Sequence, residues 1–358
     1  MESDRRPRLT PAIADVRRAV RHALVDLASR RSSEVETRSS EAEIVPLILV
    51  ALSGGPDSLA LAAATAFEAP RAGIKAGAVV VDHGLQPGSA DVAAEAARQA
   101  QLLGLAPVLV RTVTVGHGAG PEAAARDARY AALSAVAVEL GAVGVLLGHT
   151  LDDQAETVLL GLARGSGAVS LQGMDAATGV YRRPLLGIRR STTEQFCADS
   201  GLDPWHDPQN RDDAFTRVRV RHTVLPLLEN ELGPGVAEAL VRTADQLRED
   251  SDALDHFAEE IAEDLAQIVE AGIALPASAL AANPPALRQR LIRLAVSSEF
   301  HLTLSRAQTL EVARLATDWH GQKALDLPGV KVERRGGLIV FTATDAGELT
   351  GVDPILEH

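Results

Sequence analysis

Short, uninterrupted apolar runs alternate with alanine-rich segments of helical period between residues 47 and 163, and this alternation restricts the fold more than any other feature. The apolar runs cover residues 47–52, 76–82, 107–113 and 143–148, and they are followed by helical segments at 58–68, 89–103, 121–140 and 152–163. A strand buried on both faces has a continuous apolar sequence, and its alternation with helices is typical of a parallel sheet covered on both sides. The sequence therefore predicts an α/β fold with a doubly wound parallel sheet.

The first apolar run leads directly into the loop Ser53-Gly54-Gly55-Pro56-Asp57-Ser58, and a helical segment follows it. In open parallel sheets, ligands bind beyond the carboxyl ends of the strands, which is where this loop lies. The two glycines allow a close backbone approach, and a helix N-terminus offers unpaired N–H groups and the positive end of a dipole. We therefore expect an anion site, with the serine hydroxyls as phosphate donors and Asp57 as a Mg²⁺ ligand.

The same loop lacks the features of two common nucleotide-binding motifs. It has neither the Gly-Lys-Ser/Thr of a Walker loop nor a GxGxxG fingerprint. Because no lysine is available to reach a transferred γ-phosphate, cleavage of ATP between the α- and β-phosphates is the favoured chemistry. The alternative is a purely structural turn, in which glycine sets the geometry and Ser or Asp caps the helix.

Ionisable residues also follow the second and fourth apolar runs. Behind the fourth run, Asp152 and Glu156 (i, i+4) or Asp153 and Glu156 (i, i+3) share one helix face, and His149 precedes them. An acidic first turn that complements the helix dipole is the alternative, and His149 fits either a cap or a nucleotide contact.

Two further pairs of residues are candidates for nucleotide binding. Asp82 and His83 end the second run near the expected adenosine position, although Asp82 also fits a turn cap. Arg126 and Arg129, spaced i, i+3 on the third helical segment, can present two guanidinium groups to phosphate.

Composition limits the function further. The 358 residues carry a formal net charge of −13, which disfavours nucleic-acid binding unless local basic clusters supply it, and a solvated face is the alternative for such clusters. Cys197 is the one cysteine, which excludes an intramolecular disulfide, a CxxC pair and a cysteine-rich metal site. The apolar runs are far shorter than the roughly 20 residues of a bilayer span. We expect a cytoplasmic protein without a membrane or targeting segment.

The pattern changes along the chain and predicts three regions. Residues 1–44 combine an N-terminal helix with a polar linker, and residues 45–230 contain the alternating strands and helices. Residues 231–358 are expected to form a smaller, mainly helical domain. Its features are helical patterns at 235–271, 285–297 and 304–316, preceded by one at 215–231, and a strand pair predicted by the alternation and glycine turns at 322–343.

Further motifs narrow the choice of family. In chain order they are VDHGL at 81–85, EAAARDARY at 122–130, GHTLDDQAET at 148–157, RGSG at 164–167, RPLL at 183–186 and DPQNRDDAFTRVRVRHTVLPLL at 207–228. With SGGPDS at 53–58 they resemble the tRNA(Ile)-lysidine synthetases, a family of the PP-loop ATP pyrophosphatase superfamily. The resemblance covers residues 47–228 closely and the later helical region loosely.

This resemblance implies a ligase reaction that uses ATP, Mg²⁺ and L-lysine. ATP would adenylate C2 of the wobble cytidine in an isoleucine tRNA with a CAU anticodon, and lysine would then displace AMP, giving lysidine, AMP and pyrophosphate. A homodimer is compatible with it.

The resemblance also implies residue roles. Asp57 and Asp153 would bind the metal, and Asp153 would also bind the lysine ammonium group or deprotonate the nucleophile. Asp152 and Glu156 would position the lysine or the metal, and His149 would lie near the lysine. One of Arg126 and Arg129 would contact the α-phosphate or the cytidine ring. The residues expected to contact the tRNA are Asn210, Arg217, Arg219 and Arg221.

The last motif departs from the family pattern at two positions. Gln209 stands where the family usually has serine, and Val218 where it usually has a second asparagine. Neither is an expected catalytic group, so the departures bear on the tRNA contact rather than on the chemistry. The alternatives are another PP-loop enzyme, such as a tRNA thiolase or an amide synthetase, and a non-catalytic nucleotide- or RNA-binding module. Paired cysteines, expected of a thiolase, are absent from the sequence.

Overall fold

The computed structural model describes residues 9–35, 45–84, 86, 88–114, 121–165 and 167–344. Contacts between residues are concentrated within two compact units, Met1–Asp245 and Gln246–His358. The division falls within helix α10 (Val236–Leu265), whereas the predicted boundary after residue 230 falls within α9 (Leu225–Leu232). None of the helices in the described ranges combines the length and the apolar composition that a bilayer span requires.

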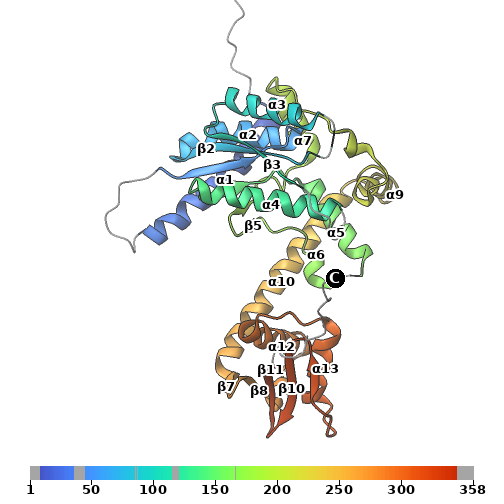
Figure 1. The fold of residues 1–358 in the computed structure, drawn as a ribbon. Helices are drawn as coiled ribbons and strands as arrows, with labels where there is room; N and C mark the ends of the chain where they lie inside the picture. Colours follow the sequence, from blue (N-terminus) through green and yellow to red (C-terminus); the bar gives the residue numbers. More distant parts are fainter. Residues whose placement is uncertain are drawn as a thin grey trace, which may run out of the picture. The chain divides into compact units, whose positions relative to one another are not determined.

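A six-stranded sheet forms the centre of the first unit, in the order β3-β2-β1-β4-β6-β5 (Figure 1). Its strands are β1 (Leu47–Ala51), β2 (Lys75–Asp82), β3 (Val108–Thr112), β4 (Gly144–Leu146), β5 (Ala177–Thr178) and β6 (Tyr181–Arg182). All neighbouring strands are parallel except β5 and β6. The predicted α/β class with a doubly wound parallel sheet is confirmed, and each of the four predicted strands is present.

Alternate residues of β1 enter two different hydrophobic cores. Ile48 and Val50 pack with apolar residues of α1 (Pro11–Val35), α2 (Pro56–Glu68), α3 (Ser89–Leu102) and α7 (Arg190–Asp199). Leu49 and Ala51 pack instead with residues of α4 (Pro121–Glu139), on the opposite face of the sheet. Because each residue of the strand enters one of these cores, no position can be polar, and the sequence is therefore continuously apolar.

The strand order creates the ligand-binding edge of the sheet. β1 lies between β2 and β4, with β2 and β3 on one side of it and β4, β6 and β5 on the other, so the chain crosses from one side of β1 to the other after β3. The loop behind β1 and helix α5 (Leu151–Ala163) behind β4 therefore begin side by side at the carboxyl ends of the two strands. The remaining elements of this unit are η1 (Ala69–Ala72), α6 (Ala168–Leu171), η2 (Pro208–Arg211), α8 (Thr216–Arg219), the π-helical turn η3 (Val220–Val224) and α9.

The second unit contains an antiparallel sheet in the order β7-β8-β11-β10-β9 (Figure 1). Its elements are β7 (Gln267–Val269), β8 (Gly272–Pro276), α11 (Ala277–Ala282), α12 (Pro285–Phe300), α13 (Arg306–Thr317), β9 (Leu325–Leu327), β10 (Val330–Arg335) and β11 (Leu338–Ala343). The hairpin of β10 and β11 matches the predicted strand pair.

The prediction of helix through residue 271 was wrong at its end, because α10 stops at Leu265 and a second hairpin, β7–β8, follows it. The turn of this hairpin places Ala271 at a φ of 61°, a left-handed conformation that alanine rarely adopts. Glycine or asparagine, the residues that usually indicate such a turn, does not occupy this position.

Candidate active site

The loop after β1 forms an open N-terminus for helix α2. Gly54 has a φ of 85°, and Gly55 is the N-cap residue but provides no side chain to cap the helix. The Ser58 hydroxyl instead donates to the carbonyl oxygen of Gly55 (3.0 Å) and accepts from the backbone N–H of Ser53 (3.2 Å). The loop is thus closed by its own serines, and the first N–H groups of α2 have no side-chain cap, which suits an anion.

Asp57 points away from its own helix and toward α7. Its Oδ2 accepts from Nε of Arg190 (3.2 Å), and its Oδ1 accepts from the hydroxyl of Thr193. Burial raises the pKa of Asp57 above its usual value, although the Arg190 guanidinium and the Thr193 hydroxyl oppose that shift. The structural alternative, in which Asp57 caps the helix, therefore does not describe its side chain.

Asp153 lies at the third position of α5 and shares Arg190 with Asp57. Its Oδ2 accepts from the backbone N–H of Thr150 (2.9 Å), closing a capping box, and its Oδ1 accepts from Nη2 of Arg190 (2.8 Å). Burial opposes ionisation, but Arg190, the Thr150 N–H and two further arginines lower the pKa of Asp153 to about 2. A carboxylate with so low a pKa is a weak proton acceptor and a good partner for cations.

Glu156, fully buried one helical turn later, is held by arginines of the 217–221 region. Nε of Arg217 lies 2.8 Å from its Oε2, and Nε of Arg221 lies 2.6 Å from its Oε1. Arg221 also reaches Oδ1 of Asp153 (3.1 Å). The tRNA contact expected of these two arginines stays a prediction, and the structure places their guanidinium groups against α5.

The other residues expected to contact tRNA or lysine occupy different positions. Arg219 is exposed and donates to the carbonyl oxygen of Asp213 (2.6 Å), on the loop before α8. The backbone carbonyl of Asn210 lies 2.9 Å from Nε2 of His222, and both residues line the polar cavity described below. Asp152 accepts from the backbone N–H of Arg190 (2.7 Å) and forms an ion pair with Arg189 (3.1 Å).

His149 does not cap α5, because Thr150 does so. Burial, with smaller contributions from nearby arginines, lowers the pKa of His149 to about 3, so the imidazole is neutral at physiological pH. Its Nδ1 is buried and has no hydrogen-bond partner among the described residues. A neutral imidazole with one open nitrogen fits a contact to a bound ligand.

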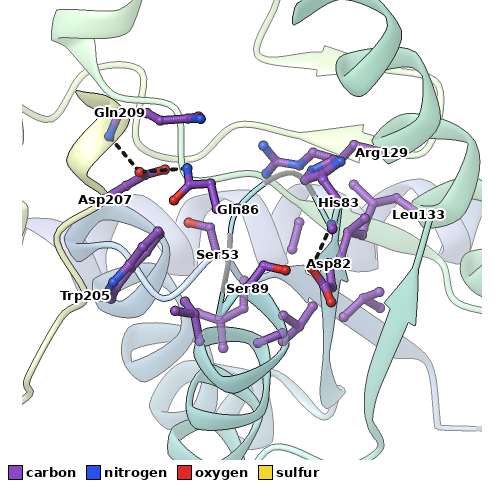
Figure 2. A pocket seen from close by; sticks show the side chains of 18 residues that line it. Ser53, Asp82, His83, Gln86, Ser89, Arg129, Leu133, Trp205, Asp207 and Gln209 are labelled. Carbon is purple, nitrogen blue, oxygen red and sulfur yellow. Dashed lines mark hydrogen bonds between the residues drawn. The ribbon is translucent and has the colours of Figure 1, made fainter. Parts of the chain in front are cut away.

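Two cavities meet at the loop. The first, of about 290 Å³, lies at the carboxyl ends of β1 and β2, and Figure 2 shows Asp82, His83, Arg129 and Leu133 along one side of it. The second, of about 430 Å³, is more polar and is lined by the loop together with His149, Asp153, Arg190, Asn210 and Arg221. Ser53, Arg129, Trp205 and Asp207 line both cavities, so the two spaces adjoin.

The two arginines of α4 are now distinguished. Arg129 is partly buried and lines both cavities, and burial lowers its pKa below the usual arginine value. Arg126 is exposed, donates to the Tyr130 hydroxyl (3.3 Å) and lies over the Tyr130 ring, 4.9 Å from its centroid. At the end of β2, Asp82 accepts from the backbone N–H of Gly84 (2.9 Å), which is the turn-capping alternative.

Several residues of the site were not predicted as site residues. Trp205 donates its backbone N–H to the carbonyl oxygen of Gly54 (2.9 Å), and Asp207 accepts from Nε2 of Gln86 (3.2 Å), so that this segment forms a wall of the first cavity (Figure 2). Arg190 and Thr193 reach Asp57 from α7. The basic residues around RPLL were the one available signal for Arg190. Within the described part of the chain, no group of three or more His, Cys, Asp or Glu side chains is arranged to hold a metal by itself.

Comparisons with known proteins match two parts of the chain to family models. Residues 29–228 match the PP-loop domain family model, and residues 275–339 match a model described as the TilS substrate binding domain. The tRNA(Ile)-lysidine synthase of Leifsonia xyli subsp. xyli is 64% identical over 296 residues, which cover 82% of this chain and 89% of that protein. The enzyme of the same name from Thermobifida fusca is 50% identical over 336 residues, covering 93% and 98% of the two chains.

A solved structure supports the fold. The U34-tRNA thiolase NcsA from Methanococcus maripaludis superposes with a TM-score of 0.51 at 20% identity, covering 66% of this chain and 80% of that one. At this identity the likeness concerns the fold alone. The family model matches more than half of the chain, and both relatives are similar over most of their length. The chain therefore carries an ATP-utilising PP-loop domain and belongs to the tRNA(Ile)-lysidine synthase family.

Proposed function

We propose that this protein joins L-lysine to C2 of the wobble cytidine in an isoleucine tRNA with a CAU anticodon, at the cost of ATP. Family membership carries the choice of substrates. The observation that supports the chemistry is that the uncapped N-terminus of α2 and the carboxylates of α5 border one polar cavity, which adjoins a second cavity on the sheet edge.

In the proposed arrangement the adenosine occupies the first cavity and the triphosphate crosses Ser53 into the polar cavity. There the N–H groups of α2 and the guanidinium of Arg129 stabilise negative charge on the phosphates. The cytidine O2 attacks the α-phosphorus, pyrophosphate leaves, and an amine of lysine then attacks C2 and releases AMP. In the first step the O2–P bond forms as the bond between the α-phosphorus and pyrophosphate breaks. In the second step the N–C2 bond forms as the C2–O2 bond breaks, so the products are lysidine, AMP and pyrophosphate.

The donor set fits a Mg²⁺ ion that is shared with the substrate. Oδ2 of Asp57 and Oδ1 of Asp153 converge on one cation, the Arg190 guanidinium, at 3.2 and 2.8 Å. Mg²⁺ commonly takes one or two protein carboxylates and completes its shell with water and substrate phosphates. We propose that these two carboxylates hold it; when bound, the ion neutralises charge on the phosphates.

The lysine substrate is proposed to bind in the polar cavity, with its cationic groups toward Asp153. Its neutral neighbour His149, with an open Nδ1, is a candidate to accept a hydrogen bond there. The pKa of about 2 favours cation binding over proton abstraction as the role of Asp153. The single buried thiol, Cys197, suits a reducing cytoplasm, which we propose as the location.

The function is tested with three substrates together. The protein is incubated with ATP, labelled lysine and isoleucine tRNA transcripts that have C or U at the wobble position. Label should enter the C transcript only, with one AMP formed per lysine. Incorporation into the U transcript, or none into either, would refute the proposal.

The site is tested by Asp57→Asn and Asp153→Asn, with the exposed and distant Asp26→Asn as control. Each site variant should lower AMP formation about 100-fold, because misplacing a group that positions the reactants costs about this much. The far-ultraviolet circular dichroism should stay unchanged. A near-normal rate in either variant would remove that residue from the mechanism.

A further inference from the structure

Arg190 joins two elements that the chemistry must keep together. Its guanidinium contacts Asp57 behind β1 and Asp153 and Glu156 behind β4, the last through Nη1 at 3.5 Å. Its side chain is only 18% exposed. The loop and α5 follow strands that are separated along the chain by three helical crossovers, through α2, α3 and α4, so this residue supplies a direct side-chain link between them.

The backbone around Arg190 fixes the direction of the side chain. Its N–H is held by Asp152 of α5 at 2.7 Å, and the residue opens helix α7. Thr193, completely buried three residues later on the same helix, donates its hydroxyl to the other oxygen of Asp57. Both carboxylate oxygens of Asp57 thus accept hydrogen bonds from side chains of one turn of α7.

Arg190 differs from the neighbouring arginines in the carboxylates with which it forms ion pairs. Arg217 and Arg221 pair with Asp153 and Glu156, whereas Arg190 is the cation paired with Asp57 among the described residues. Without it, Asp57 would keep the Thr193 hydroxyl and face Asp153 with no charge between them. Two nearby carboxylates repel each other, and the binding of another cation would relieve this repulsion.

An arginine is needed for this geometry. The guanidinium is planar and presents five N–H donors in a fixed fork, so it can address separate carboxylates in defined directions. A lysine ammonium group carries the same charge at a single point, and it cannot reproduce the contacts to Asp57 and Asp153 together.

We propose that Arg190 is a positioning residue that sets the separation of Asp57 and Asp153, and that it competes with a divalent cation for this pair in the nucleotide-free protein. The inference rests on the proposed function only in that ATP binds at this loop. It concerns the carboxylate pair before any substrate is bound.

Binding of Mn²⁺, followed by electron paramagnetic resonance without nucleotide, tests the proposal. The variants are Arg190→Gln and Arg190→Lys, with Arg189→Gln as the control, because Arg189 pairs with Asp152 and Glu238 rather than with Asp57. Arg190→Gln should bind Mn²⁺ about tenfold more tightly or better, since a neighbouring positive charge is removed. Arg190→Lys should be intermediate, and Arg189→Gln should match the wild type.

The same variants are measured for AMP formation at varied ATP. Arg190→Gln should lower kcat and raise the KM for ATP, and Arg190→Lys should rescue less than half of the lost kcat. Unchanged Mn²⁺ binding in Arg190→Gln, or full recovery by Arg190→Lys, would overturn the proposal. Failure of both variants to fold would overturn it too, because Arg190 would then be a structural residue.

The two proposals fail separately. If the wild type makes no lysidine but the Mn²⁺ contrast persists, the proposed reaction is wrong and the positioning role stands. If lysidine forms but Mn²⁺ binding is the same in all variants, the reaction stands and the role of Arg190 does not.

Discussion

Gly148, directly behind β4, controls how closely α5 approaches the ATP loop. A Cβ atom added there would lie 3.1 Å from Cα and N of Ser58 and 3.2 Å from the carbonyl carbon of Asp57. These are backbone atoms of the first turn of α2, which cannot rotate away as a side chain would. In Gly148→Ala, ordinary van der Waals contact would require this turn to move by about 0.3–0.9 Å.

The size of the effect follows from that displacement. Overpacking by one methyl group against backbone typically costs about 1–3 kcal/mol. For a unit of this size, about 2–4 °C of melting temperature is lost per kcal/mol, so a fall of roughly 2–12 °C is expected. A shift of about half an ångström in the phosphate-binding turn should also slow AMP formation about tenfold, because a 1 Å misplacement can cost about 100-fold.

Gly187→Ala is the matched control. A Cβ at Gly187 would meet nothing within 4 Å, and its backbone does not require glycine. Melting curves by circular dichroism and AMP formation with saturating tRNA and lysine are compared for both variants. Equal melting temperatures and equal rates in Gly148→Ala and Gly187→Ala would refute the reasoning that this glycine is needed for close approach.

Three other predictions concern parts of the first unit. The buried Glu68, which pairs with Arg17 and Arg21 at 2.9 Å, has its pKa lowered because these hydrogen bonds outweigh the burial that opposes ionisation. Glu68→Gln should thus cost about 2 kcal/mol in urea unfolding at pH 7. The contribution of a carboxylate with a lowered pKa disappears as pH falls through that pKa, so the difference from wild type should shrink in acid, and a pH-independent difference would contradict this. Cys197, whose pKa burial raises to about 12, should resist iodoacetamide at pH 8 in the native protein and react fully after unfolding, as mass spectrometry would detect. In Trp319→Phe, the one remaining tryptophan, Trp205, should change its fluorescence when ATP fills the adjacent cavity, and constant emission despite ATP binding in dialysis would place the nucleotide elsewhere.

The fold and the loop were predictable because their signals are local. A strand buried on two faces must be apolar throughout, and a glycine-serine loop between strand and helix has few other uses. The wall made by Trp205 and Asp207 was not predicted, because Trp205 reaches the loop from about 150 positions away, and the contact of Asp207 with Gln86 is visible only in the folded chain. The β7–β8 hairpin was missed because its turn uses alanine rather than glycine at the left-handed position.

The arginines show a different limit of the sequence. The family resemblance implied a tRNA contact for Arg217, Arg219 and Arg221, but a sequence does not tell which of these side chains meets protein. In the structure, Arg217 and Arg221, four residues apart, turn to the buried Glu156, and Arg219 turns to its own loop. A buried carboxylate that needs cations is visible only once both segments are placed.

The two-sided burial of β1 also limits how this part of the gene can vary. Insertion or deletion of one codon within residues 48–51 would send the side chains of each core into the other, because successive residues point to opposite faces. Substitutions in the strand are confined to apolar side chains of nearly equal volume. A randomised library for new substrates should therefore leave this strand fixed and vary the walls of the two cavities.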